Sequence, residues 1–302
     1  MGFRQKGDIR EAKMKVYQIV TDRIIKELEQ GKIPWAIPYV GGSGAISRAT
    51  GKPYSLLNQI LLGDPGEYVT FKQCKDEGGK VKKGVKGRIV TYWNFKEVQE
   101  KDKDGNVILD VNSKPKIKKI PYFRYYTVFH IDDCEGIAPK WQKAKGGSAQ
   151  MVHSAQDVFD RYVDREGITV SVKRGHQAVY SPTLDTIKMP EMDQFASSDE
   201  YYSTLFHEAA HSTGHKSRLD RLGIGMGKEN YAREELIAEM AACMLMSQLG
   251  LETNGSFRNN AAYIQNCLKA LKYDVRLVVV AAGAAEKAVR MINGEDVMQM
   301  AG

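Results

Sequence analysis

Two histidines and a glutamate in the second half of the chain have the spacing of a metal centre. His207, Glu208 and His211 form the pattern H-E-x-x-H in the stretch TLFHEAAHSTGH (204–215). Side chains four residues apart lie on one face of an α-helix, so both imidazoles can reach the same ion. Glu208 lies about 100° around the helix from His207, which points it towards a water on that ion. The pattern predicts a zinc site with Glu208 as general base, and another divalent ion is the alternative.

Chance is a weak explanation for this pattern. A chain with 6 histidines is expected to contain on the order of 0.01 such matches. The positions beside the two histidines and Glu208 are apolar, as a buried helix requires: Leu205, Phe206, Ala209 and Ala210.

A catalytic zinc ion needs a third protein ligand and an open position. His215 lies one further turn along the axis from His211, too far to share the ion comfortably. The long metzincin pattern requires a histidine six residues after His211, where this chain has Ser217. Carboxylates on the next predicted helix remain, and Glu235 and Glu239 share one of its faces. We expect Glu235 to bind the metal and Glu239 to orient an imidazole, with the reverse assignment as the alternative.

The other polar residues around these ligands are expected to have supporting roles or to be solvated. Glu234 lies on a different face of its helix and is expected to be solvated. Tyr231, four residues before Glu235, is a candidate to polarise a substrate carbonyl in the transition state. The basic residues after the motif are expected to form a solvated helix end, or to pair with acids such as Asp220: His215, Lys216, Arg218 and Arg221.

The first half of the chain is basic and aromatic. Residues 1–150 contain 28 Lys and Arg against 17 Asp and Glu, whereas residues 151–302 contain 16 against 20. Cations neutralise phosphates, and aromatic rings on a sheet stack on unpaired bases, so this half is predicted to bind single-stranded DNA. The predicted contacts are Lys72, Lys82, Lys83, Lys86, Arg88, Trp93, Lys116, Lys118, Lys119, Tyr122 and Arg124.

The patterns around these residues predict an α+β protein of two domains, each with enough apolar sequence for its own core. The first half contains an amphipathic helix (10–30), a short apolar helix or turn (55–63), a strand-like region (67–79) and two strands (87–98 and 116–131). These elements suit an antiparallel sheet in a DNA-binding domain over residues 8–137. The polar, glycine-containing stretch 138–150 is the expected linker.

Residues 151–302 form the expected metallopeptidase domain. They begin with a helix and three short strands (168–172, 177–181 and 186–190). The motif helix, a glycine-rich loop (222–230) and helices over 234–250, 259–272 and 276–293 follow. The strand 186–190 is expected to offer its edge to an extended peptide.

Four widely spaced cysteines suit free thiols in a reducing compartment: Cys74, Cys134, Cys243 and Cys267. No run of 18 apolar residues and no secretory signal occur. We therefore expect a cytoplasmic protein without a membrane partner.

Six stretches resemble the ArdC-type antirestriction proteins of conjugative plasmids and other mobile elements. They are IVTDRIIKELEQGKIPW (19–35), TGKPYSLLNQILL (50–62), YYTVFHIDDCEGI (125–137), YSPTLDTIKMPEMDQF (180–195), YYSTLFHEAAHSTGH (201–215) and YAREELIAEMAACML (231–245). The resemblance implies an N-terminal domain that binds single-stranded DNA and a C-terminal zincin-like metallopeptidase domain. It also implies protection of incoming single-stranded DNA against host restriction during transfer. Similar domains are joined to primases in plasmid-transfer proteins.

Three functions are compatible with these patterns. The first is an antirestriction protein that binds single-stranded DNA and carries a zinc site. The second is an active, gluzincin-like zinc metallopeptidase, recruited by DNA, that cleaves a host protein such as a restriction enzyme. The third is a protein in which the metal is purely structural. Glu208 favours a catalytic set over the third, because a structural site has no need of a general base.

Overall fold

The protein is an α+β molecule, as predicted, and is described here from a computed structural model. The structure describes residues 2–36, 44–141, 150–222, 228–251 and 261–297. Most of the expected linker (138–150) and of the expected glycine-rich loop (222–230) lies outside these residues. The α-helices are α1 (Gly2–Glu29), α2 (Leu56–Leu62), α3 (Phe71–Asp76), α4 (Gln150–Glu166), α5 (Ser198–Ser212), α6 (Lys228–Gln248), α7 (Ala261–Tyr273) and α8 (Leu277–Asn293), with 3-10 turns η1 (Ile131–Asp133) and η2 (Met192–Gln194).

The first half is built on a four-stranded sheet in the order β1-β2-β5-β4. Its strands are β1 (Ala45–Ser47), β2 (Gly66–Val69), β4 (Arg88–Gln99) and β5 (Ile117–His130), and a separate pair is formed by β3 (Lys80–Val81) and β6 (Cys134–Glu135). β1 runs parallel to β2, whereas the other pairs in the sheet are antiparallel. The sheet is therefore mixed, and its antiparallel part is the larger one.

The expected strand-like region 67–79 is only partly correct. β2 ends at Val69, and the chain then turns into helix α3. The Thr70 hydroxyl accepts a hydrogen bond from the Gln73 backbone N–H, and the Gln73 side chain accepts one from the backbone N–H of Thr70. This capping box satisfies two backbone donors and starts the helix, so the strand does not continue beyond Val69.

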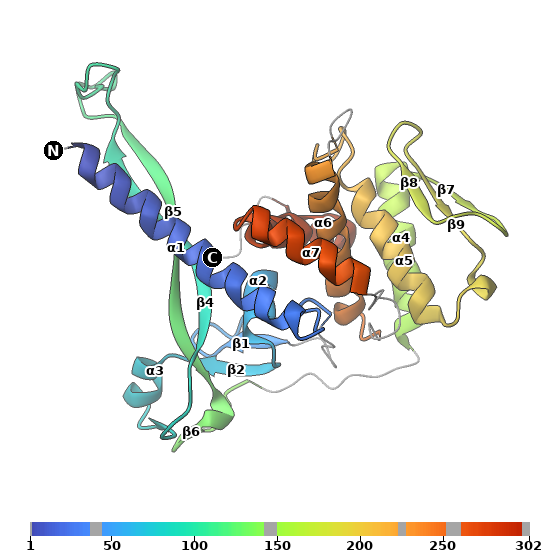
Figure 1. Ribbon diagram of the computed structural model, residues 1–302, viewed down its shortest axis with the longest axis horizontal. Helices are drawn as coiled ribbons and strands as arrows, with labels where there is room; N and C mark the ends of the chain where they lie inside the picture. Colours follow the sequence, from blue (N-terminus) through green and yellow to red (C-terminus); the bar gives the residue numbers. More distant parts are fainter. Residues whose placement is uncertain (1, 37–43, 142–149, 223–227, 252–260, 298–302) are drawn as a thin grey trace.

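β4 and β5 form a long two-stranded ribbon paired over 12 residues of β4, from Arg88 opposite Val128 to Gln99 opposite Ile117. Helix α1 crosses this ribbon, and the far end of the ribbon projects beyond the helix (Figure 1). Tyr17 of α1 stacks on Phe123 of β5 with ring centroids 5.1 Å apart. The contact fixes α1 against one face of the ribbon.

In the second half, helix α6 packs against α5, α7 and α8, and α4 packs against α5 and α8. A three-stranded sheet lies at the outer side of these helices (Figure 1). That sheet contains β7 (Thr169–Val172), β8 (Val179–Ser181) and β9 (Thr186–Met189) in the order β7-β9-β8. β9 is the central strand. The expectation that strand 186–190 offers a free edge is therefore wrong, and β8 is an edge of this sheet instead.

The two halves share their largest apolar core. One cluster of buried residues includes Val20, Ile24 and Leu28 of α1 together with Leu271 of α7 and Val278 of α8. The expectation of a separate core for each half is wrong in this respect, because α1 packs against α7 and α2 packs against α8. The expected boundaries at 137 and 151 stay a prediction.

Candidate metal centre and nucleic-acid face

Helix α5 presents the motif histidines to the neighbouring helix α6. Ser197 caps its N-terminus by accepting a hydrogen bond from the Glu200 backbone N–H. Leu205, Phe206, Ala209 and Ala210 are completely buried, so the apolar side of α5 is locked in the core. His207 and His211 consequently point at α6, where the predicted carboxylates lie.

The donor atoms of His207, His211 and Glu235 converge. The two Nε2 atoms of the histidines are 3.0 Å apart. Glu235 places Oε2 3.6 Å from Nε2 of His207 and Oε1 3.6 Å from Nε2 of His211. Ligand atoms about 2.0–2.2 Å from a tetrahedral zinc ion lie about 3.3–3.6 Å apart. The two distances to Glu235 match this range, whereas the two Nε2 atoms would have to move slightly apart to bind such an ion. His215 is not part of this cluster. Its Nδ1 lies 2.8 Å from Oγ of Ser217 instead.

The opposite nitrogen of each histidine faces another carboxylate of α6. Nδ1 of His207 lies 4.0 Å from Oε1 of Glu239, and Nδ1 of His211 lies 3.6 Å from Oε1 of Glu234. Carboxylates in this position fix the orientation of a metal-binding imidazole. The geometry supports Glu235 as the ligand and Glu239 as the orienting residue, an assignment that remains a prediction.

Glu234 is not solvated, contrary to expectation. Its side chain is 4% exposed, and its carboxylate accepts hydrogen bonds from Arg221 at 2.8 and 3.2 Å. Arg221 also donates to the Ala210 carbonyl and the Thr213 hydroxyl at the end of α5. Glu234 therefore links the end of the motif helix to the His211 ring, a role that its position in the sequence did not reveal.

Charge coupling controls the protonation of these residues. Burial disfavours a charged His207, but the hydrogen bond with Glu235 and the charges of Glu239 and Glu208 outweigh it and raise the pKa of His207. Burial likewise opposes ionisation of Glu234 and Glu235. Hydrogen bonds with His211 and Arg221 nevertheless lower the pKa of Glu234, and a hydrogen bond with His207 lowers the pKa of Glu235. The carboxylates are thus held ionised beside the histidines, as a cation site requires.

Glu208 is buried and held by a backbone hydrogen bond from β8, and its predicted role as general base stays a prediction. It is 7% exposed, and its Oε2 accepts a hydrogen bond of 2.6 Å from the Tyr180 backbone N–H on β8. The Tyr180 hydroxyl donates to Asp185, whose carboxylate forms an ion pair with Arg218. Arg218 in turn donates to the Ser212 carbonyl at the end of α5. This network ties β8 to the motif helix and fixes the strand that holds Glu208.

Two of the four basic residues after the motif, Arg218 and Arg221, are therefore not part of a solvated helix end, whereas Lys216 is exposed as expected. The Arg218 side chain is 2% exposed and that of Arg221 is 10% exposed, and their acid partners are Asp185 and Glu234. Neither pairs with Asp220. Buried guanidinium groups with acid partners stabilise a fixed geometry at the end of the motif helix.

A cavity of about 1410 Å³ opens on the metal donors. Its walls include edge strand β8 and helix α7, together with the exposed Tyr231, whose hydroxyl forms a hydrogen bond that lowers the pKa of Glu235. This bond directs Tyr231 towards the metal donors. The role of Tyr231 towards a substrate carbonyl stays a prediction.

The β4–β5 ribbon divides the predicted DNA contacts between two faces, because directly opposed residues point the same way. Trp93 lies opposite Phe123, on the side of α1. Tyr122 lies opposite Asn94 and Arg124 lies opposite Tyr92, on the other side. That side also carries Val90, opposite Tyr126, which is buried in a small core. The exposed and half-exposed side chains on that side, named here the Tyr122 face, are Tyr92, Asn94, Lys96, Val98, Lys118, Ile120, Tyr122, Arg124 and Tyr126.

The Tyr122 face is exposed or half-exposed at each of these positions. The Arg124 guanidinium lies over the Tyr122 ring at 5.2 Å, and the Tyr92 and Tyr126 rings are 5.6 Å apart. Lys96, Lys118 and Arg124 add cations beside these rings. Aromatic rings beside cations are the groups with which proteins commonly bind single-stranded nucleic acids.

Several other predicted contacts already have partners within the protein. Arg88 pairs with Asp64 and donates to the Tyr68 hydroxyl, so it holds the sheet together. Lys72, Lys116 and Lys119 pair with acids, and Lys82 donates to the Asp132 carbonyl. Lys83 and Lys86 are exposed and lie between β3 and β4, before the first paired residue of the ribbon, so they are not part of the Tyr122 face.

Comparison with known proteins shows which family this chain belongs to. Residues 14–129 match the N-terminal domain of anti-restriction factor ArdC, and residues 157–284 match a zincin-like metallopeptidase domain. A metal-free crystal structure of the antirestriction protein ArdC from plasmid R388 is 36% identical to this chain. It superposes with a TM-score of 0.70 over 91% of this chain and 96% of that protein. The chain belongs to the ArdC antirestriction family.

Other relatives extend the comparison. A second R388 ArdC structure, with Mn(II) bound, is 34% identical, with a TM-score of 0.69 over 92% of this chain and 97% of that protein. Two DNA primases TraC of Escherichia coli are each 35% identical over 92% of this chain, but the match spans only 20% and 27% of the primases. An uncharacterized protein y4eC of Sinorhizobium fredii is 28% identical over 90% of this chain and 89% of its own length.

Family membership confirms the predicted combination of an ArdC-type N-terminal domain with a zincin-like domain, and the zincin-like domain implies a divalent metal. The candidate donors of this ArdC-family chain lie within the metallopeptidase match. None of the described helices combines the length and the apolar character that are needed to cross a bilayer.

Proposed function

We propose that this ArdC-family protein binds single-stranded DNA on the Tyr122 face and protects incoming DNA from host restriction. The observation that carries the proposal is the exposed combination of cations and aromatic rings on that face. The cations neutralise phosphates, and the rings offer stacking platforms that accept any base, because every base has a π-face. A protein of this kind acts on DNA of many sequences, which suits a mobile element, and it works in the cytoplasm of the recipient cell.

Substitutions on the Tyr122 face test this proposal. Lys118→Gln with Arg124→Gln should weaken binding to a single strand and reduce the slope of log affinity against log salt by about 1.4, or about 0.7 per cation. Tyr92→Ala with Tyr122→Ala should weaken binding by about 1–3 kcal/mol per stacked base while leaving the slope unchanged. Fluorescence anisotropy across a salt series measures both effects.

A matched control removes the same charge elsewhere. Arg161→Gln with Lys173→Gln deletes two exposed cations of the C-terminal half, and affinity and slope should stay at wild-type values. An undiminished slope in the Lys118 and Arg124 variant would exclude the Tyr122 face as the phosphate site.

The second part of the proposal concerns the metal centre. We propose that His207, His211 and Glu235 hold a divalent ion, zinc or another such as manganese, with Glu239 and Glu234 orienting the imidazoles. A bound ion would act as a Lewis acid towards a carbonyl and lower the pKa of a water. Glu208 is placed to accept a proton with one carboxylate oxygen, while the Tyr180 N–H holds the other.

One observation favours a second function, an active metallopeptidase that cleaves a host protein. Edge strand β8 borders the cavity that contains the metal donors, and its backbone holds the general base. An extended peptide can pair with such an edge and pass the site.

Glu208→Gln separates the two functions. The variant keeps a hydrogen-bond acceptor but no base, so it should retain bound metal and lose any hydrolysis. The measurements are metal content by mass spectrometry and efficiency of DNA transfer into a restricting host. Full antirestriction by this variant would exclude proteolysis as the protective mechanism.

A further inference from the structure

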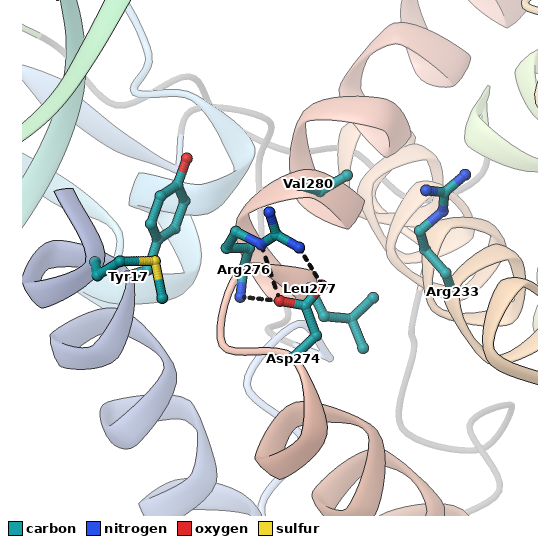
Figure 2. A pocket seen from close by; sticks show the side chains of 7 residues that line it. Tyr17, Arg233, Asp274, Arg276, Leu277 and Val280 are labelled. Carbon is teal, nitrogen blue, oxygen red and sulfur yellow. Dashed lines mark hydrogen bonds and ion pairs between the residues drawn. The ribbon is translucent and has the colours of Figure 1, made fainter. Parts of the chain in front are cut away.

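A smaller cavity lies where the N-terminal helix meets the metallopeptidase half. It has a volume of about 470 Å³ and is lined by Met14 and Tyr17 of α1, Arg233 of α6, and Asp274, Arg276, Leu277 and Val280 near the start of α8 (Figure 2). Arg233, Asp274 and Leu277 also line the larger cavity that contains the metal donors. The two cavities therefore adjoin each other.

The cavity contains more positive than negative charge. Asp274 forms an ion pair with Arg276 at 3.1 Å (Figure 2). Arg233 adds a second guanidinium group, so the lining contains two cations and one anion. The Nε atom of Arg233 is buried and has no hydrogen-bond partner among the described residues. A buried guanidinium N–H without an acceptor is unfavourable, so an anion bound here would satisfy it.

The cavity also touches the proposed DNA-binding half directly. Its Tyr17 wall stacks on Phe123 of the ribbon, and Phe123 lies 4.9 Å from the Trp93 ring. The half-exposed rim residues Met14 and Val280 are apolar. The site thus combines two guanidinium groups with an apolar rim, beside the ribbon.

We propose that this cavity is a second site for single-stranded DNA, in which Arg233 and Arg276 bind backbone phosphates at the junction between the two halves. The inference rests on the proposed function. A guanidinium fork matches phosphate oxygens, and a strand alternates phosphates with apolar sugar and base surfaces. Asp274 competes with phosphate for Arg276, so it weakens binding at this site.

The test uses the full chain and a fluorescent single strand of about 20 nucleotides. Arg233→Gln and Arg276→Gln should each weaken binding about fivefold at low salt and reduce the salt slope by about 0.7. Arg233→Lys should keep the slope. Asp274→Asn should change binding in the opposite direction, towards higher affinity. The Arg161→Gln and Lys173→Gln control should behave as wild type, and thermal melting should show that each variant is folded.

Three outcomes would overturn the inference. If wild type binds the strand but Arg233→Gln and Arg276→Gln do so with unchanged affinity and slope, the second site is wrong while the proposed function stands. If Arg233→Gln weakens binding of a labelled oligoglutamate peptide and not of DNA, the cavity recognises an acidic peptide instead. If wild type does not bind the strand at all, the proposed function fails and takes the inference with it.

Discussion

Single residues set the geometry of the candidate metal centre, and two carboxylates adjacent in sequence have different surroundings in it. Glu235 faces the Nε2 side of both histidines, whereas Glu234 faces Nδ1 of His211 and pairs with Arg221. The H-E-x-x-H spacing made His207, Glu208 and His211 predictable, because helix periodicity alone brings them together. The role of Glu234 was not predictable, since it depends on the rotation of α6 against α5 and on an arginine 13 residues away.

Glu234→Gln should damage both the metal site and the fold. Loss of the carboxylate removes the partner of His211 and should lower metal affinity about 10- to 100-fold. It also leaves the buried Arg221 without its ion pair, which should lower the free energy of unfolding by about 3–5 kcal/mol. Competition with a chromophoric chelator and urea denaturation measure these effects.

Glu239→Gln is the matched comparison for that experiment. Glu239 faces Nδ1 of His207 at 4.0 Å, so its substitution should lower metal affinity with a smaller loss of stability. Wild-type metal affinity in Glu234→Gln would contradict the proposed orienting role.

Elements set the geometry that single residues use, and strand order was the least predictable part of it. The local sequence predicted three short strands between α4 and α5, and three are present. Their order depends on pairing between strands, which the local sequence does not encode: β9 is the central strand and β8 is the edge beside Glu208. Helix α3 was missed although Thr70 and Gln73 have the spacing of a capping box, which was the available sign.

The contact between β8 and α5 should make stability depend on pH through Asp185. Burial alone would raise the pKa of Asp185, but hydrogen bonds from Arg218 and Tyr180 outweigh it and lower that pKa. A lowered pKa stabilises the fold above the ordinary value of about 3.9, and this contribution is lost as the pH falls through the folded-state value. Asp185→Asn should therefore destabilise the metal-free protein by about 1–3 kcal/mol near neutral pH.

Urea denaturation in the presence of a chelator measures this difference as a function of pH. The gap between wild type and Asp185→Asn should narrow as the pH falls below about 3.9. Asp220→Asn is the control, since Asp185 and Asp220 both have positive φ, 45° and 47°, and asparagine tolerates that backbone. A gap that stays constant with pH would show that the ion pair does not stabilise the fold.

The whole molecule joins the ribbon that is proposed to bind DNA to the proposed metal centre through a shared core. The two-half organisation was predictable from the uneven charge and the resemblance to ArdC proteins. The shared core was not, because it depends on α1 packing against the helices of the second half. Because α1 packs in the shared core, the two halves are not independent of each other. Experiments on DNA binding should therefore use the full chain.

The most direct measurement is equilibrium binding of the full-length protein to a single strand and to the corresponding duplex across a salt series. Aromatic rings can stack only on unpaired bases, so the single strand should bind more tightly at every salt concentration. Its affinity should fall linearly on a logarithmic scale as salt rises. Equal or tighter binding to the duplex would contradict the proposed function.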